Sequence, residues 1–485
     1  MAGSESNGGA QAAPKSGRPR VVIVGAGFGG LNAANALGGK DVDVLVIDRN
    51  NYHGFWPFLY QVATSQVEVE AVAFPIRGAL RKHKNVAFKM AEVRGVDFSG
   101  RRVLTDEDAI PYDYLILAAG SETNYFGNDE MAKHAYGLKD IEEADRLRNH
   151  ILSVIEAAAR ETDPERRQAL LTFVIVGGGP TGCELSGSLM TLIRRTLTKD
   201  FPGLDLTKAH VMLVQGAPTV LPPFHEKLRK HAHERLQSFG VDVRLDTVVK
   251  SVDNGIVTFS DGSTTAATTV VWAAGVRAAN LIGTLGLDTA SLGRVAVTPT
   301  LNHKDYPEVF AIGDVMHLAD YRPKKGADPV PYPMLAQVAI QGGKRAAKNV
   351  LLMKDGKQPE PFSYFDKGIM AIIGNRAAIV EGLGMKMKGM PGWFAWLGLH
   401  IVYLVGFRNR VLVLLDWFGD YVLGNNGVRV ITRPEFRDHV ASVHERVLDH
   451  RRRTNTGLQV LSPEMVAAAT AAAEQAAAEK AAAEK

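Results

Sequence analysis

The chain contains two glycine-rich turns of the same kind, and each follows a short run of strand-forming residues. The first is Val21–Gly30, VVIVGAGFGG, and the second is Phe173–Gly182, FVIVGGGPTG. In the pattern Gly-x-Gly-x-x-Gly, the first glycine permits a tight turn, the second lets the backbone approach a pyrophosphate, and the third lets helix and strand pack closely. The phosphates then face free N–H groups at a helix N-terminus. One such turn indicates little, because glycine turns after strands are common, but two predict two dinucleotide sites in one protein.

Four further strand ends carry residues suited to a bound nucleotide. The strand Val42–Ile47 ends in Asp48, about 20 residues beyond the first glycines, where a carboxylate accepts hydrogen bonds from both ribose hydroxyls. Two apolar strands end in Ala118-Ala119-Gly120 and Ala273-Ala274-Gly275, where small residues let the chain pass close to a cofactor. The strand Val309–Ile312 ends in Gly313-Asp314, which offers a carboxylate to a cofactor hydroxyl. Taken singly, these ends are equally compatible with a solvated aspartate or an ordinary turn.

Composition narrows the class of protein. A length of 485 residues allows two or three domains, and the formal charge of +4 is too small to indicate a nucleic-acid partner. Cys183 is the only cysteine, which excludes an internal disulfide and fits a reducing compartment. No metal site is predicted. Residues 1–19 are expected to form a disordered leader, and residues 451–485, rich in Ala, Glu and Lys, a solvated helical tail.

Strand-period and helix-period segments alternate from residue 20 onward, which predicts an α/β fold. The order of the motifs resembles that of the two-dinucleotide-binding flavoproteins, a family that includes the pyridine nucleotide-disulfide reductases. The resemblance implies two Rossmann-like domains, with FAD on the first turn and NAD(P)H on the second. The implied divisions are residues 20–150 and 286–370 for the FAD domain, 151–285 for the inserted NADH domain, and 371–450 for a C-terminal membrane-docking helical region.

The cysteine count restricts where the electrons go. Disulfide reductases and sulfide:quinone oxidoreductases use paired cysteines, and Cys183 has no partner, so it is expected to be a small packing residue. Five segments resemble those of the type II, non-proton-pumping NADH:quinone oxidoreductases: Phe55–Thr64, Asn124–Gly127, Gly179–Glu184, Ala336–Gln341 and Tyr364–Gly368. The likeness extends to about residue 420 and is greatest to actinobacterial members. It implies an enzyme that passes electrons from NADH through FAD to a quinone.

Three side chains are expected to be catalytic. Gln337 and Gln341 are four residues apart and share a helix face, so their amides can bond two quinone oxygens without bringing charge into an apolar tunnel. Spacing alone favours an ordinary polar helix face, and the resemblance reverses that preference. Glu184 is expected in the first turn of its helix, where the helix dipole favours a carboxylate. The resemblance implies that Glu184 lies near the nicotinamide, where the NADH and quinone sites meet; a merely stabilising carboxylate is the alternative.

The resemblance also implies which residues bind the two nucleotides. For FAD they are Gly25, Gly27, Phe28, Gly29, Gly30, Asp48, Ala119, Gly120, Gly313, Asp314 and Lys367. For NADH they are Gly177, Gly179, Thr181, Gly182, Gln215 and Gly275. Gln215 departs from the family, which usually has Asp or Glu there to bond the adenosine ribose and repel the extra phosphate of NADPH. We therefore expect a preference for NADH with weaker discrimination than usual.

Two apolar segments near the C-terminus indicate how the chain reaches a membrane quinone. Trp393–Phe407 extends roughly 22 Å at about 1.5 Å per residue, which is short for a helix that spans the ~30 Å hydrocarbon core. Arg408, Asn409 and Arg410 interrupt this apolar segment. The helix predicted after them has an apolar stripe, and Asp416 and Asp420 lie on its opposite side. The stripe contains Val411, Leu414, Leu415, Phe418 and Val422. Together with the resemblance, these features favour peripheral, monotopic membrane docking, with the arginines at lipid headgroups. The resemblance implies that the docking is on the cytoplasmic side of the cell membrane. A buried helix pair or a dimer interface is the alternative.

The expected activity is hydride transfer from NADH to FAD, followed by delivery of two electrons to a membrane quinone without proton pumping. Menaquinone is the expected quinone, although the sequence does not distinguish it from ubiquinone. Homodimers are common in the family, and the oligomeric state stays open. Two other functions remain: a soluble NAD(P)H reductase of a protein acceptor, and a flavin-bound redox sensor of the apoptosis-inducing-factor type.

Overall fold

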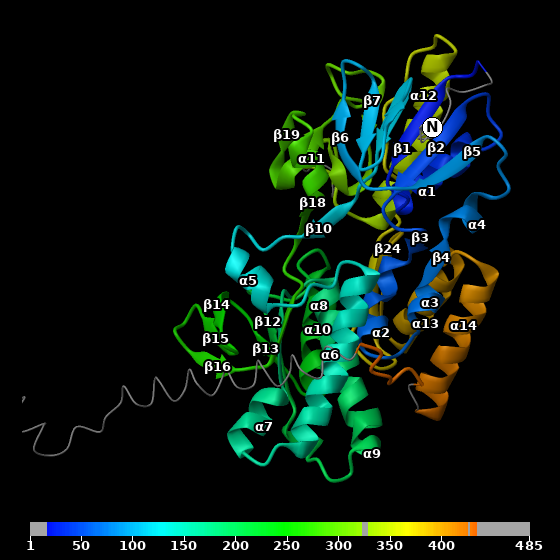
Figure 1. The fold of residues 1–485 in the computed structure, drawn as a ribbon. Coiled ribbons are helices and arrows are strands. Elements are labelled where there is room, and N and C mark those ends of the chain that lie inside the picture. The colour runs from blue at the N-terminus through cyan, green and yellow to red at the C-terminus, as the bar shows by residue number, and fades with distance from the viewer. Residues whose placement is uncertain (1–16, 323–327, 425–426, 434–485) are drawn as a thin grey trace, which may run out of the picture.

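A computed structural model describes residues 17–322, 328–424 and 427–433, so the predicted tail and nearly all of the predicted leader lie outside the described residues. The chain forms two lobes, each built around a parallel sheet (Figure 1). The predicted α/β fold is confirmed.

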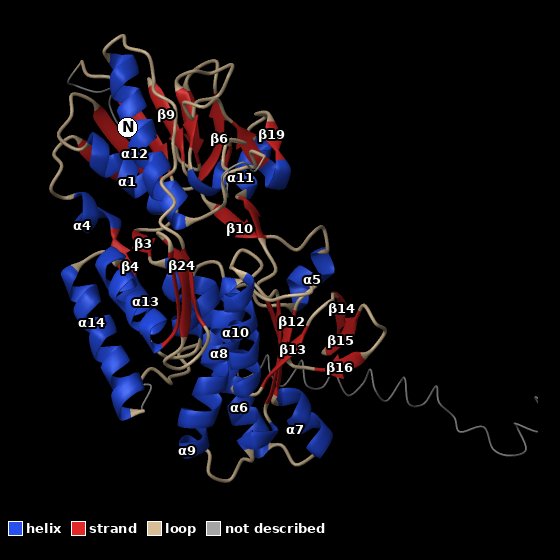
Figure 2. Cartoon of the chain, turned by 180° about the vertical axis from the view of Figure 1, so that it is seen from behind, coloured by secondary structure: helices blue, strands red, loops and turns tan. Residues whose placement is uncertain are grey.

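The first lobe contains a five-stranded parallel sheet in the order β21-β9-β1-β2-β5. Its strands are β1 (Arg20–Val24), β2 (Asp43–Asp48), β5 (Val86–Met90), β9 (Tyr114–Leu117) and β21 (Val309–Ala311). The run Val21–Val24 is buried because both faces of the sheet are covered. Helices α1 (Phe28–Leu37) and α12 (Ala336–Lys354) cover one face. A three-stranded meander and helix α11 (Asn280–Thr284) cover the other side (Figure 2). The meander consists of β6 (Val93–Asp97), β7 (Arg102–Thr105) and β8 (Ala109–Pro111).

The second lobe repeats this plan with a four-stranded parallel sheet in the order β13-β12-β11-β17. Its strands are β11 (Thr172–Val176), β12 (His210–Val214), β13 (Val241–Arg244) and β17 (Thr269–Trp272). Alternate strand residues face α6 (Ile141–Arg160), α8 (Pro180–Thr191) and α10 (Glu226–Ser238) on one side, and a three-stranded meander on the other. The meander consists of β14 (Val249–Asp253), β15 (Ile256–Phe259) and β16 (Thr264–Ala266).

The chain passes between the lobes twice. Strand β10 (Ser121–Thr123) leads into the second lobe and pairs antiparallel with β18 (Val276–Ala278), which leads out of it. This ribbon places the crossings earlier than the predicted divisions at residues 150 and 285, because α6 already belongs to the second lobe and α11 to the first. The domain divisions themselves stay a prediction.

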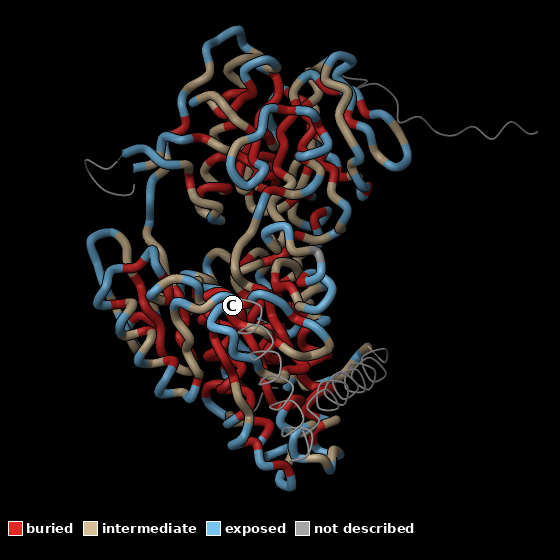
Figure 3. Tube along the Cα trace, turned by 90° about the vertical axis from the view of Figure 1, so that its left-hand side faces the viewer, coloured by how far each residue is buried: buried red, intermediate tan, exposed pale blue. Residues whose placement is uncertain are grey.

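The C-terminal region adds the antiparallel sheet β23 (Ile369–Ile372), β24 (Ala378–Gly382) and β25 (Met385–Gly389). Helices α13 (Met390–Tyr403) and α14 (Phe407–Phe418) follow, and a π-helical turn, Gly419–Leu423, extends α14. One face of α13 and α14 joins the largest core of the molecule together with α2 (Leu59–Ala63), α6 and α8. Figure 3 shows the buried chain concentrated in each lobe.

The remaining elements complete the two lobes and connect them. They are β3 (Tyr52–Gly54), α3 (Val69–Val72), β4 (Ala73–Pro75), α4 (Ile76–Leu80), α5 (Asp129–His134), α7 (Pro164–Leu170), α9 (Thr198–Asp200), β19 (Thr289–Ala290), β20 (Arg294–Ala296) and β22 (Met316–His317).

Candidate active site

The first glycine turn joins β1 to α1 and forms a cradle that only glycine can build. Gly25 has a φ of +101°, and a Cβ at Gly30 would lie 1.8 Å from the carbonyl oxygen of Gly25. A Cβ at Gly27 would meet nothing within 4 Å, so this glycine faces open space at the N-terminus of α1. The close helix–strand contact and the open second glycine fit a bound pyrophosphate.

Asp48 ends β2 beside this turn. Its Oδ2 accepts a hydrogen bond from Ala26 N at 2.7 Å, and its Oδ1 accepts one from Asn50 N at 2.8 Å. Burial raises the pKa of Asp48, and the Ala26 N–H opposes that shift. Asp48 therefore braces the turn and keeps lone pairs for a ribose hydroxyl. Phe28, at the start of α1, packs edge-on against His53 at 5.2 Å between ring centroids.

The Ala-Ala-Gly segments have a contact that the sequence interpretation missed. A Cβ at Gly25 would lie 2.3 Å from Ala118 O, and one at Gly177 would lie 2.5 Å from Ala273 O. The backbone of each segment therefore packs against its own glycine turn, and this contact requires glycine at positions 25 and 177 before any cofactor is considered. Ala119 and Gly120 follow this contact in the first lobe, and both are partly exposed.

Gly313 and Asp314 lie at the end of β21, at the same edge of the sheet as the first turn. Gly313 has a φ of +68° and packs against α12 through Ala339, whose Cβ would be 3.1 Å from a Cβ at Gly313. Asp314 accepts a hydrogen bond from the hydroxyl of Ser121, and Lys139 Nζ lies 3.5 Å from its Oδ2. Ser121 was not predicted, since 193 residues separate it from Asp314.

The second turn repeats the geometry of the first between β11 and α8. Gly177 has a φ of +110°, a Cβ at Gly182 would lie 1.9 Å from Gly177 O, and one at Gly179 would meet nothing within 4 Å. Thr181 is exposed in the first turn of α8. Gln215 Oε1 accepts a hydrogen bond from Gly178 N at 2.9 Å, as Asp48 does from Ala26 N in the first lobe. Gln215 thus holds the structural place of the usual acid.

Glu184 lies on α8, but in its second turn rather than in the first turn as the sequence analysis expected. Only 9% of the residue is exposed, and Oε1 accepts a hydrogen bond from Ile372 N of β23 at 3.3 Å. Burial raises the pKa of Glu184 to about 8, and this hydrogen bond opposes the shift. Desolvation, not the helix dipole, dominates this site, so Glu184 can hold a proton near neutral pH.

Cys183 precedes Glu184 and is fully buried in the core beneath the second sheet. Burial raises the pKa of its thiol, and Sγ lies 3.5 Å from Gly178 O. An inert thiol at a helix–sheet contact matches the expected packing residue.

Helix α12 carries the two predicted glutamines and packs closely on α1, where a Cβ at Gly343 would lie 2.3 Å from Gly29 O. The side chain of Gln341 is engaged on both sides: Nε2 donates to Phe365 O at 3.0 Å, and Oε1 accepts from Phe365 N at 2.9 Å. Gln341 therefore clamps the loop that leads to Lys367. This arrangement differs from the expected pair of equivalent amides facing one ligand.

Lys367, Tyr403 and Gln337 meet at the end of α13. Lys367 Nζ donates to Tyr403 Oη at 2.9 Å. The hydrogen bond from Lys367 lowers the pKa of Tyr403, and an amide hydrogen bond from Gln337 contributes. Tyr403 was predicted only as part of an apolar segment, since nothing in the sequence links it to Lys367. The result is a polar cluster of ammonium, phenol and amide at the boundary between the first lobe and the C-terminal helices.

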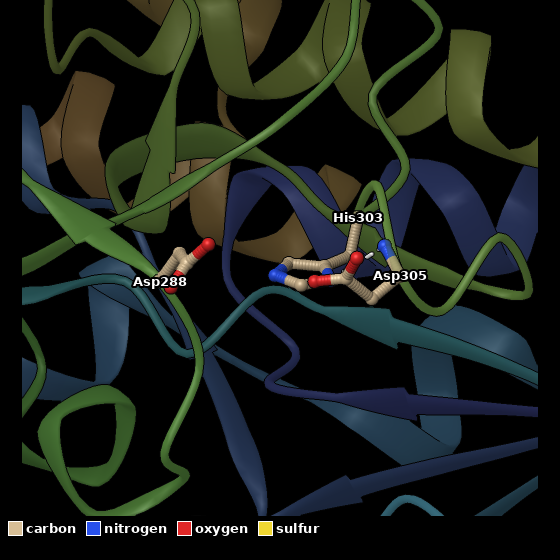
Figure 4. Close-up of side chains that lie close together, drawn as sticks. All are labelled: Asp288, His303 and Asp305. Carbon is tan, nitrogen blue, oxygen red and sulfur yellow. Dashed lines mark hydrogen bonds and ion pairs between the residues drawn. The ribbon is translucent and has the colours of Figure 1, made fainter.

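One group of side chains in the described part of the chain has spacing suited to a metal ion: Asp288, His303 and Asp305 (Figure 4). Lys304 Nζ lies 2.6 Å from Asp288 Oδ2 and 4.0 Å from Asp305 Oδ2. His303 Nδ1 accepts a hydrogen bond from Asp305 N at 3.2 Å. The lysine already balances the carboxylates, so the group gives no support for a metal site.

The outward face of α13, α14 and the following turn is apolar; we call it the C-terminal apolar face. Its exposed residues are Phe394, Leu399, Val402, Phe407, Val411, Leu414, Leu415, Phe418, Val422 and Leu423. The predicted stripe of α14 therefore faces outward, which disfavours a buried helix pair within the chain. Trp393 and Trp396, by contrast, are buried in the core. Arg410 donates to the carbonyls of Leu404 and Val402 and so caps α13, whereas Arg408 is exposed.

Within the described residues, no helix combines the length and apolar character needed to cross a bilayer. This matches the estimate that the segment around α13 is short for a span.

Comparison with known proteins defines the class first. The sequence profile of the pyridine nucleotide-disulphide oxidoreductases matches residues 19–343. The fold matches the structure of NDH2 from Plasmodium falciparum in complex with NADH, with a TM-score of 0.77 at 19% identity, over 86% of this chain and 100% of that one. The class is thus that of flavoproteins with two dinucleotide-binding lobes.

Curated relatives narrow the class. Type II NADH:quinone oxidoreductase Ndh of Mycobacterium tuberculosis is 41% identical over 432 residues, which cover 86% of this chain and 90% of that protein. Type II NADH:quinone oxidoreductase of Staphylococcus aureus is 30% identical over 386 residues, 78% of this chain and 93% of that protein. The chain belongs to the type II NADH:quinone oxidoreductases, as the resemblance predicted.

Proposed function

We propose that the chain oxidises NADH and reduces a membrane quinone without pumping protons, with FAD as its resident cofactor. A bound FAD would supply the hydride acceptor for NADH and the two-electron donor for the quinone. The two matched glycine cradles support this proposal, because each offers an open second glycine and a helix N-terminus to one pyrophosphate.

The first lobe would hold FAD through the backbone of its glycine turn and through two carboxylates at the same edge of the sheet. Asp48, after β2, would bind the ribose, and Asp314, after β21, would bind a hydroxyl farther along the cofactor. The second lobe would hold NADH through Gly177, Gly179 and Gly182, with Thr181 and Gly275 beside them. Positioning the two rings and excluding water are the protein's contributions to this transfer.

The cluster of Lys367, Tyr403 and Gln337 carries the assignment of the quinone site. It places two hydrogen-bond donors and an amide between the first lobe and α13, whose far side belongs to the C-terminal apolar face. A quinone head needs donors to its carbonyl oxygens, while its tail needs an apolar route to lipid. In this proposal Gln337 and Lys367 bind the quinone, Gln341 holds the loop that carries Lys367, and Glu184 supplies a proton from its buried carboxyl.

The substitution Tyr403→Phe tests the quinone site, because it removes the hydroxyl and keeps the ring. We expect kcat/KM for quinone to fall about tenfold or more, because the Tyr403 hydroxyl holds the Lys367 ammonium in place and a hydrogen bond to a charged partner contributes about 1.5–3 kcal/mol. NADH oxidation with the soluble acceptor ferricyanide should keep its wild-type rate. Equal losses with both acceptors would contradict the assignment and point to damage at the FAD or NADH site.

The same proposal extends to the membrane. The C-terminal apolar face would insert into the lipid interface of the cytoplasmic side of the cell membrane, as a peripheral, monotopic contact. Menaquinone is the proposed quinone, and a homodimer the proposed assembly. The polar cluster and the exposed apolar face favour reduction of a membrane quinone over a soluble reductase of a protein acceptor or a redox sensor, because neither alternative accounts for both features.

A further inference from the structure

Phe126 is an aromatic residue in an unfavourable backbone conformation with most of its surface exposed. Its φ is +54°, a region that bulky side chains rarely adopt, and 65% of the residue is exposed. Burial in a core therefore does not explain why a phenylalanine stands there. Residues held in such conformations often serve a site, provided that the surrounding structure fixes them.

Asn124 fixes the conformation of Phe126. Asn124 N donates to Gly275 O at 3.0 Å, and Trp272 Nε1 donates to Asn124 O at 2.8 Å, so Asn124 is tied to the end of β17. The side-chain Oδ1 of Asn124 then accepts a hydrogen bond from Phe126 N at 2.9 Å. The outermost atoms of the ring reach over Gly275, where a Cβ would lie 3.3 Å from Phe126 Cζ.

The ring lines a cavity of about 470 Å³ between the two lobes. Phe126, Ala274 and Gly275 come from the side of the second lobe, and Arg294 and Met334 come from the first. Met334 lies two residues before α12, the helix that packs on the first glycine turn. The cavity therefore lies between the end of β17 and the segment that leads into α12, the helix packed on the first glycine turn.

The order of the second sheet indicates which part of a dinucleotide reaches this cavity. Gln215 follows β12, the glycine turn follows β11, and Gly275 follows β17, and these strands are neighbours in that order. In this fold the adenosine ribose lies at the residue after the second strand, and the pyrophosphate at the glycine turn. The remaining half of NADH then extends past Gly275, beside Phe126.

We propose that Phe126 is an NADH-binding residue whose ring packs against the nicotinamide-ribose half of the dinucleotide where it crosses between the lobes. This inference rests on the proposed function, since it requires NADH on the second glycine turn. Asn124 is the positioning residue, which holds the ring over Gly275. A flat apolar ring suits this place because it packs on the ribose and nicotinamide faces and excludes water from the path to the first lobe.

The test compares Phe126→Ala, Phe126→Gly and Phe126→Tyr in the full-length, FAD-loaded chain. Calorimetric titration with NAD⁺ and with ADP separates the two halves of the ligand, because ADP lacks the nicotinamide ribose. Phe126→Ala and Phe126→Gly should weaken NAD⁺ binding about 3- to 10-fold, the loss expected for one aromatic contact, and leave ADP binding unchanged. Phe126→Tyr should bind both ligands like the wild type, and KM for NADH should follow the NAD⁺ result.

The variant Phe126→Gly separates the effect of losing the ring from the effect of relieving the backbone strain. At a φ of +54°, Phe126→Gly should melt at a higher temperature than Phe126→Ala while showing the same loss of NAD⁺ binding. Leu104→Ala, which shortens an exposed apolar residue on β7, is the control and should bind both ligands normally. Wild-type NAD⁺ affinity in Phe126→Ala, or equal losses for NAD⁺ and ADP, would overturn the inference. If the wild type turns over NADH, either result leaves the proposed function standing; failure of the wild type to oxidise NADH would instead overturn that function.

Discussion

Burial decides the behaviour of single residues at this site, and Glu184 is the plainest case. A carboxylate on a helix after a glycine turn looks favourable for ionisation, but its place in the second turn and its desolvation favour the neutral acid. The sequence pattern predicted the helix that carries Glu184, but Glu184 lies in its second turn and not in its first. Its environment depends on β23, which is 188 residues away, and no local pattern reports that contact.

The raised pKa of Glu184 makes a prediction about stability. An acid whose pKa is about 8 when folded and near 4.5 when unfolded keeps its proton only in the folded chain between these values. The free energy of unfolding therefore falls as pH rises from about 4.5 to about 8. Glu184→Gln removes this contribution, so relative to the wild type it should gain on the order of 3 kcal/mol in going from pH 5 to pH 8. Denaturant unfolding at both pH values measures the difference; a constant gap would show that Glu184 titrates normally.

Gln215 gives a second prediction at this scale. A carboxylate in its place would repel the 2′-phosphate of NADPH, while an amide does not. Arg244, the residue whose carbonyl accepts from Gln215 N, is itself paired with Asp242 at 3.2 Å, so its charge is already balanced. Gln215→Glu should raise the preference for NADH over NADPH about tenfold in kcat/KM, or about 1.4 kcal/mol. Gln215→Ala is the control, and an unchanged ratio in Gln215→Glu would place the adenosine elsewhere.

Among the elements, α13 and α14 each present two faces. Trp396 and Trp417 face inward and are nearly fully buried, while Leu415 and Phe418 face outward. The stripe on α14 was predictable because its spacing follows the helical period. The inward orientation of the two tryptophans was not predictable, because the sequence does not show whether an aromatic residue belongs to a core or to a membrane interface. Deleting both helices would therefore damage the core as well as the apolar face.

Surface substitution is the cleaner test of the C-terminal apolar face. The double variant Leu415→Ser/Phe418→Ser should reduce binding to liposomes at least tenfold, because each buried apolar side chain contributes about 1.5–3 kcal/mol. Its melting temperature should stay near that of the wild type, since both residues are more than half exposed. Leu104→Ser, in the first lobe, should bind liposomes normally. Undiminished liposome binding by the double variant would contradict membrane docking through the C-terminal apolar face.

For the whole molecule, the alternating strand and helix periods predicted the α/β fold, and the order of the motifs, through its resemblance to a known family, implied two dinucleotide-binding domains; a strand, a glycine turn and a helix are local in sequence and so can be recognised there. The joints between the lobes were not predictable in the same way. The β10–β18 ribbon, the bond from Ser121 to Asp314, and the contact of Lys367 with Tyr403 all join distant segments. In the proposed function the chemistry depends on these joints, because NADH held by the second lobe would have to reach a cofactor held by the first.

The central claim is that NADH electrons leave this chain through a quinone. The direct measurement is NADH oxidation by the purified, FAD-loaded protein in liposomes, followed with menaquinone and ubiquinone analogues in turn. We predict rapid, quinone-dependent oxidation with one quinol formed per NADH consumed, fastest with the menaquinone analogue. A long-lived reduced protein that neither quinone reoxidises would contradict the account and favour a redox sensor.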